Sequence, residues 1–186
     1  MTMKEVAIDS IRVSLINYQR VVLLREVDGD RYLPIWIGPY EADAIAVCLK
    51  EKTIARPLTH DLLKEIIYVL EASVSFINVY DLKGDTFFAH VSLVKKDGSE
   101  IVVDCRPSDA LALAVRCDVP VYAEESVLER AGINMDRDSV AESQGEEVSG
   151  DINMGAGGKF VDEQGLSAFD SFIDTLDLDG FNNSKP

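Results

Sequence analysis

The sequence is poor in the residues that mark several protein classes. Its 186 residues include three cysteines, Cys48, Cys105 and Cys117, which form no CxxC pair and fit no zinc-ligand spacing. No apolar run approaches the roughly 18 residues that a membrane span needs. The odd cysteine count and the lack of a signal-peptide pattern predict a cytoplasmic protein without a membrane partner.

Positive charge is also scarce. The chain has 18 Lys and Arg against 33 Asp and Glu, a net charge of −15. Affinity for nucleic acid depends on Lys and Arg that displace counterions, so this composition opposes loose binding to a phosphate backbone. From Asn134 onward there are 12 acidic and 3 basic residues, so much of the negative charge lies in the last part of the chain.

Well-known catalytic signatures are absent as well. The sequence has no HEXXH motif, no HNH-like spacing and no convincing PD-(D/E)xK arrangement, and neither a Walker loop nor GxGxxG. A nuclease assignment must therefore depend on other residues.

Apolar periodicity predicts four helices. The first runs from about Tyr40 to Glu51. The second follows Arg56-Pro57, with Thr59 as a plausible N-cap, and the third runs from Pro107 to about Cys117. A short apolar stretch, Val119–Ala123, precedes a fourth over Glu124–Arg130. The second helix is expected to bury five apolar residues at helical spacing: Leu62, Leu63, Ile66, Ile67 and Leu70.

The sequence pattern of the first 133 residues predicts two similar halves. Each half has three predicted strands followed by two helices, and a shift of 66 aligns Ala42–Val47 with Ser108–Leu113. Pro34 in the third strand indicates a sheet edge or a bulge. We predict an α+β domain with a duplicated unit of three strands and two helices. It would form one barrel-like or strongly curved, mostly antiparallel sheet with helices packed against it.

The rest of the chain changes character. Residues 134–160 are acidic and glycine-rich, as in a linker. Residues 161–186 form an acidic tail, in which residues 167–177 place apolar side chains at helical spacing. We expect this short amphipathic helix to dock on its own domain, on a neighbouring subunit or on another protein. We also expect sheet edges and apolar helix faces to favour a homo-oligomer.

Three segments carry a family resemblance. LPIWIGPYEADAIAV, RPLTHDLL and VDCRPSDALALAVR occur in this order, and at similar spacing, in the bifunctional nuclease domain family. The chain resembles a bacterial member of that family over residues 3–133. The resemblance implies a nuclease that acts on DNA, on RNA or on both.

The segment CRPSDALALA, with Asp104 just before it, places polar residues where a strand meets a helix. Asp104 and Asp109 could hold Mg²⁺ or Mn²⁺, while Arg106 and Ser108 could contact a phosphate near the helix N-terminus. The same residues also fit ordinary helix-start chemistry, because Pro107 and Asp109 suit the first turn.

RPLTHDLL carries two further candidates. His60 could serve as a general base near neutral pH, and Asp61 lies beside it in the first turn. Alternatively, Asp61 favours the helix dipole and His60 is a surface or bridging side chain. Glu41 lies in the family pattern IWIGxxE and is the third predicted metal ligand. His90, the other histidine, is predicted to have a structural role.

Two functions follow. The first is a metal-dependent nuclease, with His60, Asp61, Arg106 and Ser108 as catalytic residues and with Glu41, Asp104 and Asp109 as ligands of Mg²⁺ or Mn²⁺. The alternative is a non-catalytic module that binds a protein or a small anion and assembles as a homo-oligomer.

Overall fold

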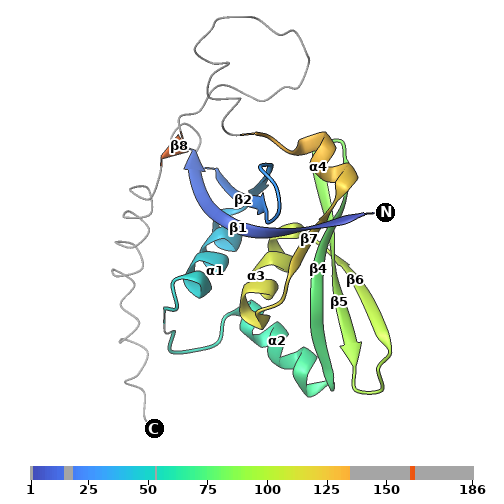
Figure 1. Ribbon diagram of the computed structural model, residues 1–186. Coiled ribbons are helices and arrows are strands. Elements are labelled where there is room, and N and C mark those ends of the chain that lie inside the picture. The colour runs from blue at the N-terminus through green and yellow to red at the C-terminus, as the bar shows by residue number, and fades with distance from the viewer. Residues whose placement is uncertain (1, 15–18, 53, 135–159, 162–186) are drawn as a thin grey trace, which may run out of the picture.

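Strands and helices alternate in blocks along the chain (Figure 1). The computed structural model describes residues 2–14, 19–52, 54–134 and 160–161. The predicted helix at 167–177 and nearly all of the predicted linker lie outside these residues. The strands are β1 (Met3–Ser14), β2 (Arg20–Glu26), β3 (Tyr32–Ile37), β4 (Ala72–Lys83), β5 (Thr86–Lys95), β6 (Glu100–Cys105), β7 (Val121–Glu124) and β8 (Phe160–Val161). The helices are α1 (Pro39–Leu49), α2 (Thr59–Val69), α3 (Pro107–Cys117) and α4 (Glu125–Ala131).

The strands form one mixed sheet in the order β3-β2-β1-β7-β4-β5-β6, with β8 paired to β1. Strands β1, β2 and β3 form one antiparallel meander, and β4, β5 and β6 form a second. β7 lies between the two meanders and runs antiparallel to β1 and parallel to β4. In Figure 1, β7 lies between β1 and β4. β3 is an edge strand, as Pro34 predicted, because proline cannot donate to a further strand.

The predicted barrel-like or strongly curved sheet was wrong. The sheet is open, and among the described residues its end strands β3 and β6 do not pair with each other. The cause is the apolar stretch near Val121, which is a strand and joins the two meanders edge to edge. The second half is therefore three strands, a helix, a strand and a helix, so the predicted identical order in both halves was also wrong. The α+β class is confirmed.

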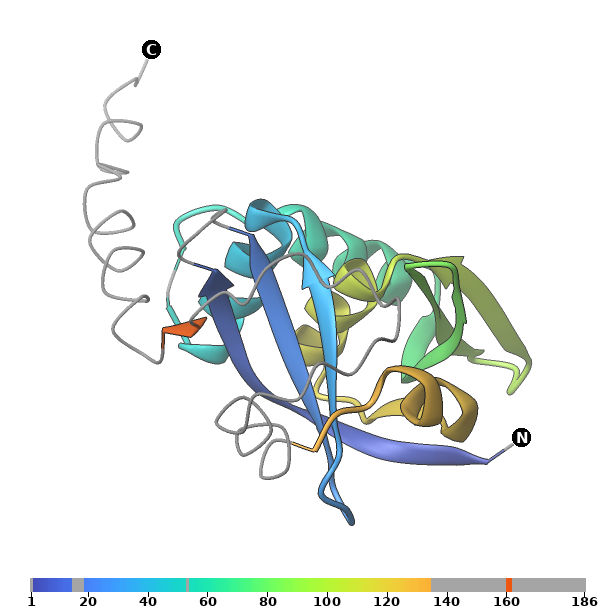
Figure 2. The ribbon, with the colours of Figure 1, turned by 90° about the horizontal axis from the view of Figure 1, so that it is seen from above.

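The core lies between the sheet and α3. Ile77, Val79 and Ala89 of the sheet and Leu111 and Leu113 of α3 are essentially inaccessible to solvent. α3 lies between α1 and α2, and Figure 2 shows these three helices gathered on one side of the strands. Within the part of the chain that is described, no helix combines the length and apolar content needed to cross a membrane.

α2 contradicts the expected buried stripe. None of its residues is buried, although the helix forms where one was predicted, with Leu58 rather than Thr59 as its N-cap residue. Of the five predicted stripe residues, Ile67 alone packs against the core. The exposed fractions of Leu62 and Leu70 are 55% and 71%. Apolar spacing predicted the helix correctly but gave the wrong face toward the core.

Candidate functional site

Three helices begin close together, each on a local feature that favours a helix start. Pro39 and Pro107 occupy the first turns of α1 and α3, where the missing proline N–H is not needed. Before Thr59, the backbone N–H of Leu58 donates to the carboxylate of Asp61 at 2.7 Å. The first turns of these helices therefore carry most of the predicted site residues.

Arg106 joins two of the helix starts. Its Nε and Nη2 donate to the carboxylate of Asp109 at 2.7 and 2.9 Å. Its Nη1 lies 2.9 Å from Glu41 Oε1 on α1. His60 on α2 adds a longer contact, with Nε2 at 3.4 Å from Asp109 Oδ1. We call Glu41, His60, Arg106 and Asp109 the Arg106 cluster.

A glycine makes room for the α1 member of this cluster. A Cβ atom at Gly38, the residue before α1, would collide with the carboxylate of Glu41. The absence of a side chain therefore lets Glu41 fold back over the helix start, where an acid is also favoured by the helix dipole.

The cluster presents an exposed cation. The hydrogen bonds from Arg106 lower the pKa of Asp109, although burial opposes this shift. The same interaction raises the pKa of Arg106. The side chain of Arg106 is 65% exposed, against 31% for Asp109, 20% for Glu41 and 13% for His60. Solvent thus meets a guanidinium whose inner side is held by two carboxylates.

Asp61 turns to another partner. Its Oδ1 accepts from Arg116 Nε at 2.6 Å, and the Arg116 side chain is only 4% exposed. Burial raises the pKa of Asp61, but hydrogen bonds from Leu58 and Arg116 outweigh it, so the pKa lies below its usual value. Asp61 therefore compensates a buried arginine on α3.

Two other predicted residues have different surroundings. Asp104 on β6 accepts a hydrogen bond from Tyr80 on β4 at 3.0 Å. Ser108 is buried at the start of α3, with 6% exposure. Cys105 lies between these two residues in the sequence. Burial raises the pKa of its thiol to about 11, so this thiol is neutral at physiological pH.

The described residues do not fit the predicted Mg²⁺ or Mn²⁺ site. Arg106 occupies the space between Glu41 and Asp109 and bonds to both oxygens of Asp109. Asp104 bonds to Tyr80 elsewhere. In the ranges that are described, no group of three or more His, Cys, Asp or Glu is placed to hold a metal ion.

Sequence reasoning missed two features. Arg116 lies one turn after Ala112 on the buried face of α3, and a charged residue on such a face signals a buried partner. Tyr80 stacks on His90 with ring centroids 4.4 Å apart, and burial lowers the pKa of His90. Because His90 and Asp104 are paired in the sheet, strand alternation places them on one face.

A pocket of about 440 Å³ lies beside the Asp61–Arg116 pair. Its walls come from the second half of α1, the α1–α2 connection, the first turn of α2 and the last turn of α3. Lys52, Arg56 and Arg116 contribute positive charge, and Glu51 and Asp61 contribute negative charge. The pocket therefore has one more basic than acidic side chain.

Residues 22–136, more than half of the chain, match the bifunctional nuclease domain. The chain is 38% identical over 179 residues to the Mycobacterium tuberculosis protein described as uncharacterized protein Rv1829, covering 96% of this chain and 98% of that protein. It is 25% identical over 128 residues to bifunctional nuclease 1 of Oryza sativa subsp. indica, and 30% identical over 107 residues to bifunctional nuclease 1 of Arabidopsis thaliana.

The two plant alignments cover different shares of the proteins compared. They include 68% and 56% of this chain, but only 39% and 33% of the rice and Arabidopsis proteins. The matched region contains α1, α2 and α3 and every member of the Arg106 cluster. This chain belongs to the bifunctional nuclease domain family.

Proposed function

We propose that this chain is a nuclease that hydrolyses phosphodiester bonds of DNA or RNA at the Arg106 cluster. The observation that carries the proposal is Arg106, a 65% exposed arginine held by two carboxylates beside a histidine. The relatives named bifunctional nuclease support the reaction class.

Arg106 would bind the substrate phosphate. A guanidinium has five N–H donors, and carboxylates of the cluster accept from three of them. The other two can donate to phosphate oxygens, and they would stabilise the charge that grows as the attacking oxygen adds to phosphorus. Asp109 and Glu41 act here as positioning residues, because they hold the guanidinium plane.

His60 would accept the proton. If Nε2–H donates to Asp109, the other ring nitrogen carries a lone pair. Nδ1 then takes a proton from the attacking water as its oxygen bonds to phosphorus. The bond to the leaving oxygen breaks, and that oxygen takes a proton from solvent. No step requires a metal ion, in keeping with the donor set described above.

Charge limits how the substrate is held. The phosphate must bind close to the negative charges of Asp109 and Glu41, and the first 133 residues hold 21 acidic and 15 basic side chains. We therefore expect weak binding through few phosphates. A single arginine contact releases about one counterion, so affinity should fall only about tenfold for each tenfold rise in salt.

The test uses the purified full chain and labelled single-stranded DNA and RNA, each with Mg²⁺, with Mn²⁺ and with EDTA. Arg106→Gln should lower the cleavage rate by about 100-fold or more, because it removes the charge that stabilises the transition state. The matched control is Arg130→Gln, since Arg130 is also an exposed arginine that forms an ion pair with an aspartate, Asp81, at 3.6 Å. Equal rates for both variants and the wild type would reveal a contaminating nuclease and overturn the proposal.

A second candidate is binding of a small anion in the pocket beside Arg116. Its support is the group Lys52, Arg56 and Arg116 on the pocket wall. Titration calorimetry with inorganic phosphate tests it. Arg56→Gln should abolish the binding heat and leave cleavage unchanged, whereas no heat with the wild-type chain would exclude this candidate.

A further inference from the structure

α2 carries an apolar stripe that faces solvent. Successive residues of a helix turn by about 100°, so five side chains share one face, and their exposed fractions run from 39% to 71%. We call this set the α2 stripe: Leu62, Leu63, Ile66, Val69 and Leu70. An amphipathic helix normally buries such a stripe.

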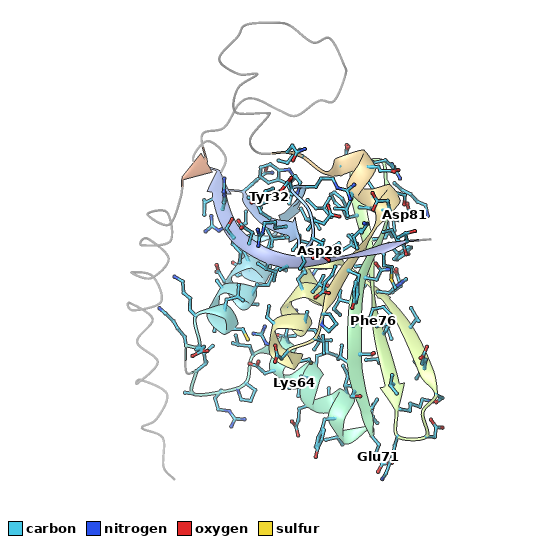
Figure 3. All side chains as sticks on the ribbon, viewed as in Figure 1. Asp28, Tyr32, Lys64, Glu71, Phe76 and Asp81 are labelled. Carbon is cyan, nitrogen blue, oxygen red and sulfur yellow. The ribbon has the colours of Figure 1, made fainter. Side chains whose placement is uncertain are left out.

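Polar bonds hold α2 in this orientation. His60 contacts Asp109, Asp61 pairs with Arg116, and Lys64 Nζ donates to the backbone carbonyl of Arg116. Figure 3 shows Lys64 at the junction of α2 and α3. Turning the stripe inward would break these bonds and leave Arg116 buried without its partner. The stripe therefore stays outside the core of its own chain.

We propose that a second copy of this chain covers the α2 stripe, with the two α2 helices antiparallel about a twofold axis. The stripe is symmetric about Ile66. Leu62 and Leu70 lie four residues to either side of it, and Leu63 and Val69 lie three residues to either side. In an antiparallel pair, Ile66 meets its equivalent, and each flanking residue meets the other copy's residue from the opposite end of the stripe. A twofold interface requires this self-complementarity.

Size and packing agree with this occupant. Residues spaced by four along a helix form the ridges that interdigitate between packed helices. The stripe exposes several hundred Å² of apolar surface, which approaches one partner's share of an ordinary protein interface, about 800 Å². Antiparallel helices also oppose their dipoles favourably.

Charge favours a second copy over the acidic segment 162–186 as the occupant of the α2 stripe. Lys64 faces α3, so the charged residues next to the stripe are Glu65, which precedes Ile66, and Glu71, which follows Leu70 and pairs with Lys96 at 2.6 Å. Two acids and one base give this rim a net charge of −1. Each copy therefore brings little charge to the contact, although each chain carries −15. The acidic segment 162–186 would gain no electrostatic attraction from such a rim.

The experiment is sedimentation equilibrium of the full chain at micromolar concentration. The wild type should have twice the mass of one chain. Ile66→Glu should raise the dimer dissociation constant by about 30-fold or more, because it buries a charge at the centre of the interface. Tyr68→Glu is the matched control, since Tyr68 is 74% exposed on the same helix but lies off the stripe, and this variant should remain a dimer.

Two outcomes would overturn the proposal. The first is a monomeric wild type. The second is an Ile66→Glu variant that is folded by circular dichroism and still dimeric. If the wild type is monomeric and Ile66→Glu speeds proteolysis within residues 162–186, the stripe is assigned to that segment instead.

A second variant guards against a folding defect in Ile66→Glu. At the twofold axis, Ile66→Cys should form a disulfide between two chains under oxidation, and Tyr68→Cys should form much less. The wild-type chain gives the background from its own cysteines. Equal crosslinking of both variants would contradict the antiparallel arrangement.

Discussion

α2 and α3 are both 11-residue helices near an Arg-Pro pair, yet they have opposite environments. Eight residues of α3 are buried and none of α2 is. In α3 the apolar residues face the sheet, whereas in α2 His60 and Lys64 face α3. Apolar spacing therefore indicated that a helix forms, but the side of α2 that faces inward is the one that carries the polar bonds to α3.

The largest expected effect separates the two helices directly. Leu111→Ala in α3 should lower the free energy of unfolding by about 3 kcal/mol, because Leu111 is fully buried and its loss leaves a cavity. Leu62→Ala in α2 should cost less than about 0.5 kcal/mol in dilute protein, because Leu62 is 55% exposed. Urea unfolding measures both. Equal losses would mean that α2 contributes to the core as much as α3 does.

An intermediate effect is expected where the helices are joined. Asp61→Ala removes the partner of buried Arg116 and should cost about 2 kcal/mol, less than for a wholly buried pair because Asp61 is 39% exposed. Glu65→Ala, on the exposed side of α2, is the control and should be nearly neutral. Thermal or urea unfolding of both variants gives the comparison. A loss for Asp61→Ala as small as that of the control would show that the polar bonds do not orient α2.

The smallest effect concerns pH. The folded-state pKa of Asp109 lies below the ordinary 3.8, so its charged form stabilises the fold. The wild type should exceed Asp109→Asn in stability by about 1 kcal/mol above that pH, and the difference should shrink as the pH falls below it. Unfolding curves between pH 2 and 7 measure this, with Asp28→Asn in an exposed turn as the control. A difference independent of pH would rule out the charge effect.

Local patterns predicted some elements well. α3 runs from Pro107 to Cys117 as expected, because proline marks its first turn and the apolar run is long. The apolar stretch near Val121 was too short to be recognised as a strand, since four residues show little alternation. The sheet order depends on that strand, so the open sheet could not be derived from local pattern.

The candidate site was predictable in part for a similar reason. The family pattern identified Glu41, and the two Arg-Pro motifs identified His60 and Asp109 near helix N-termini, but neither showed that Arg106 would bond to both Glu41 and Asp109. His60 and Asp61 are neighbours that point about 100° apart on α2, so one meets Asp109 and the other meets Arg116. Such directions depend on how helices pack, and spacing along one chain does not contain that information.

The central position of β7 has a consequence for the order in which the chain folds. β1 pairs with β7 across more than a hundred residues of sequence, and β7 also pairs with β4. During synthesis, each meander can form from local contacts as it emerges from the ribosome. The two meanders can join into one sheet only after β7, which ends at Glu124, has emerged. Pairing β7 with β1 closes a loop of more than a hundred residues, which is slow. We therefore expect β7 to pair with β1 and β4 late in folding, and until it does both meanders would leave strand edges unpaired.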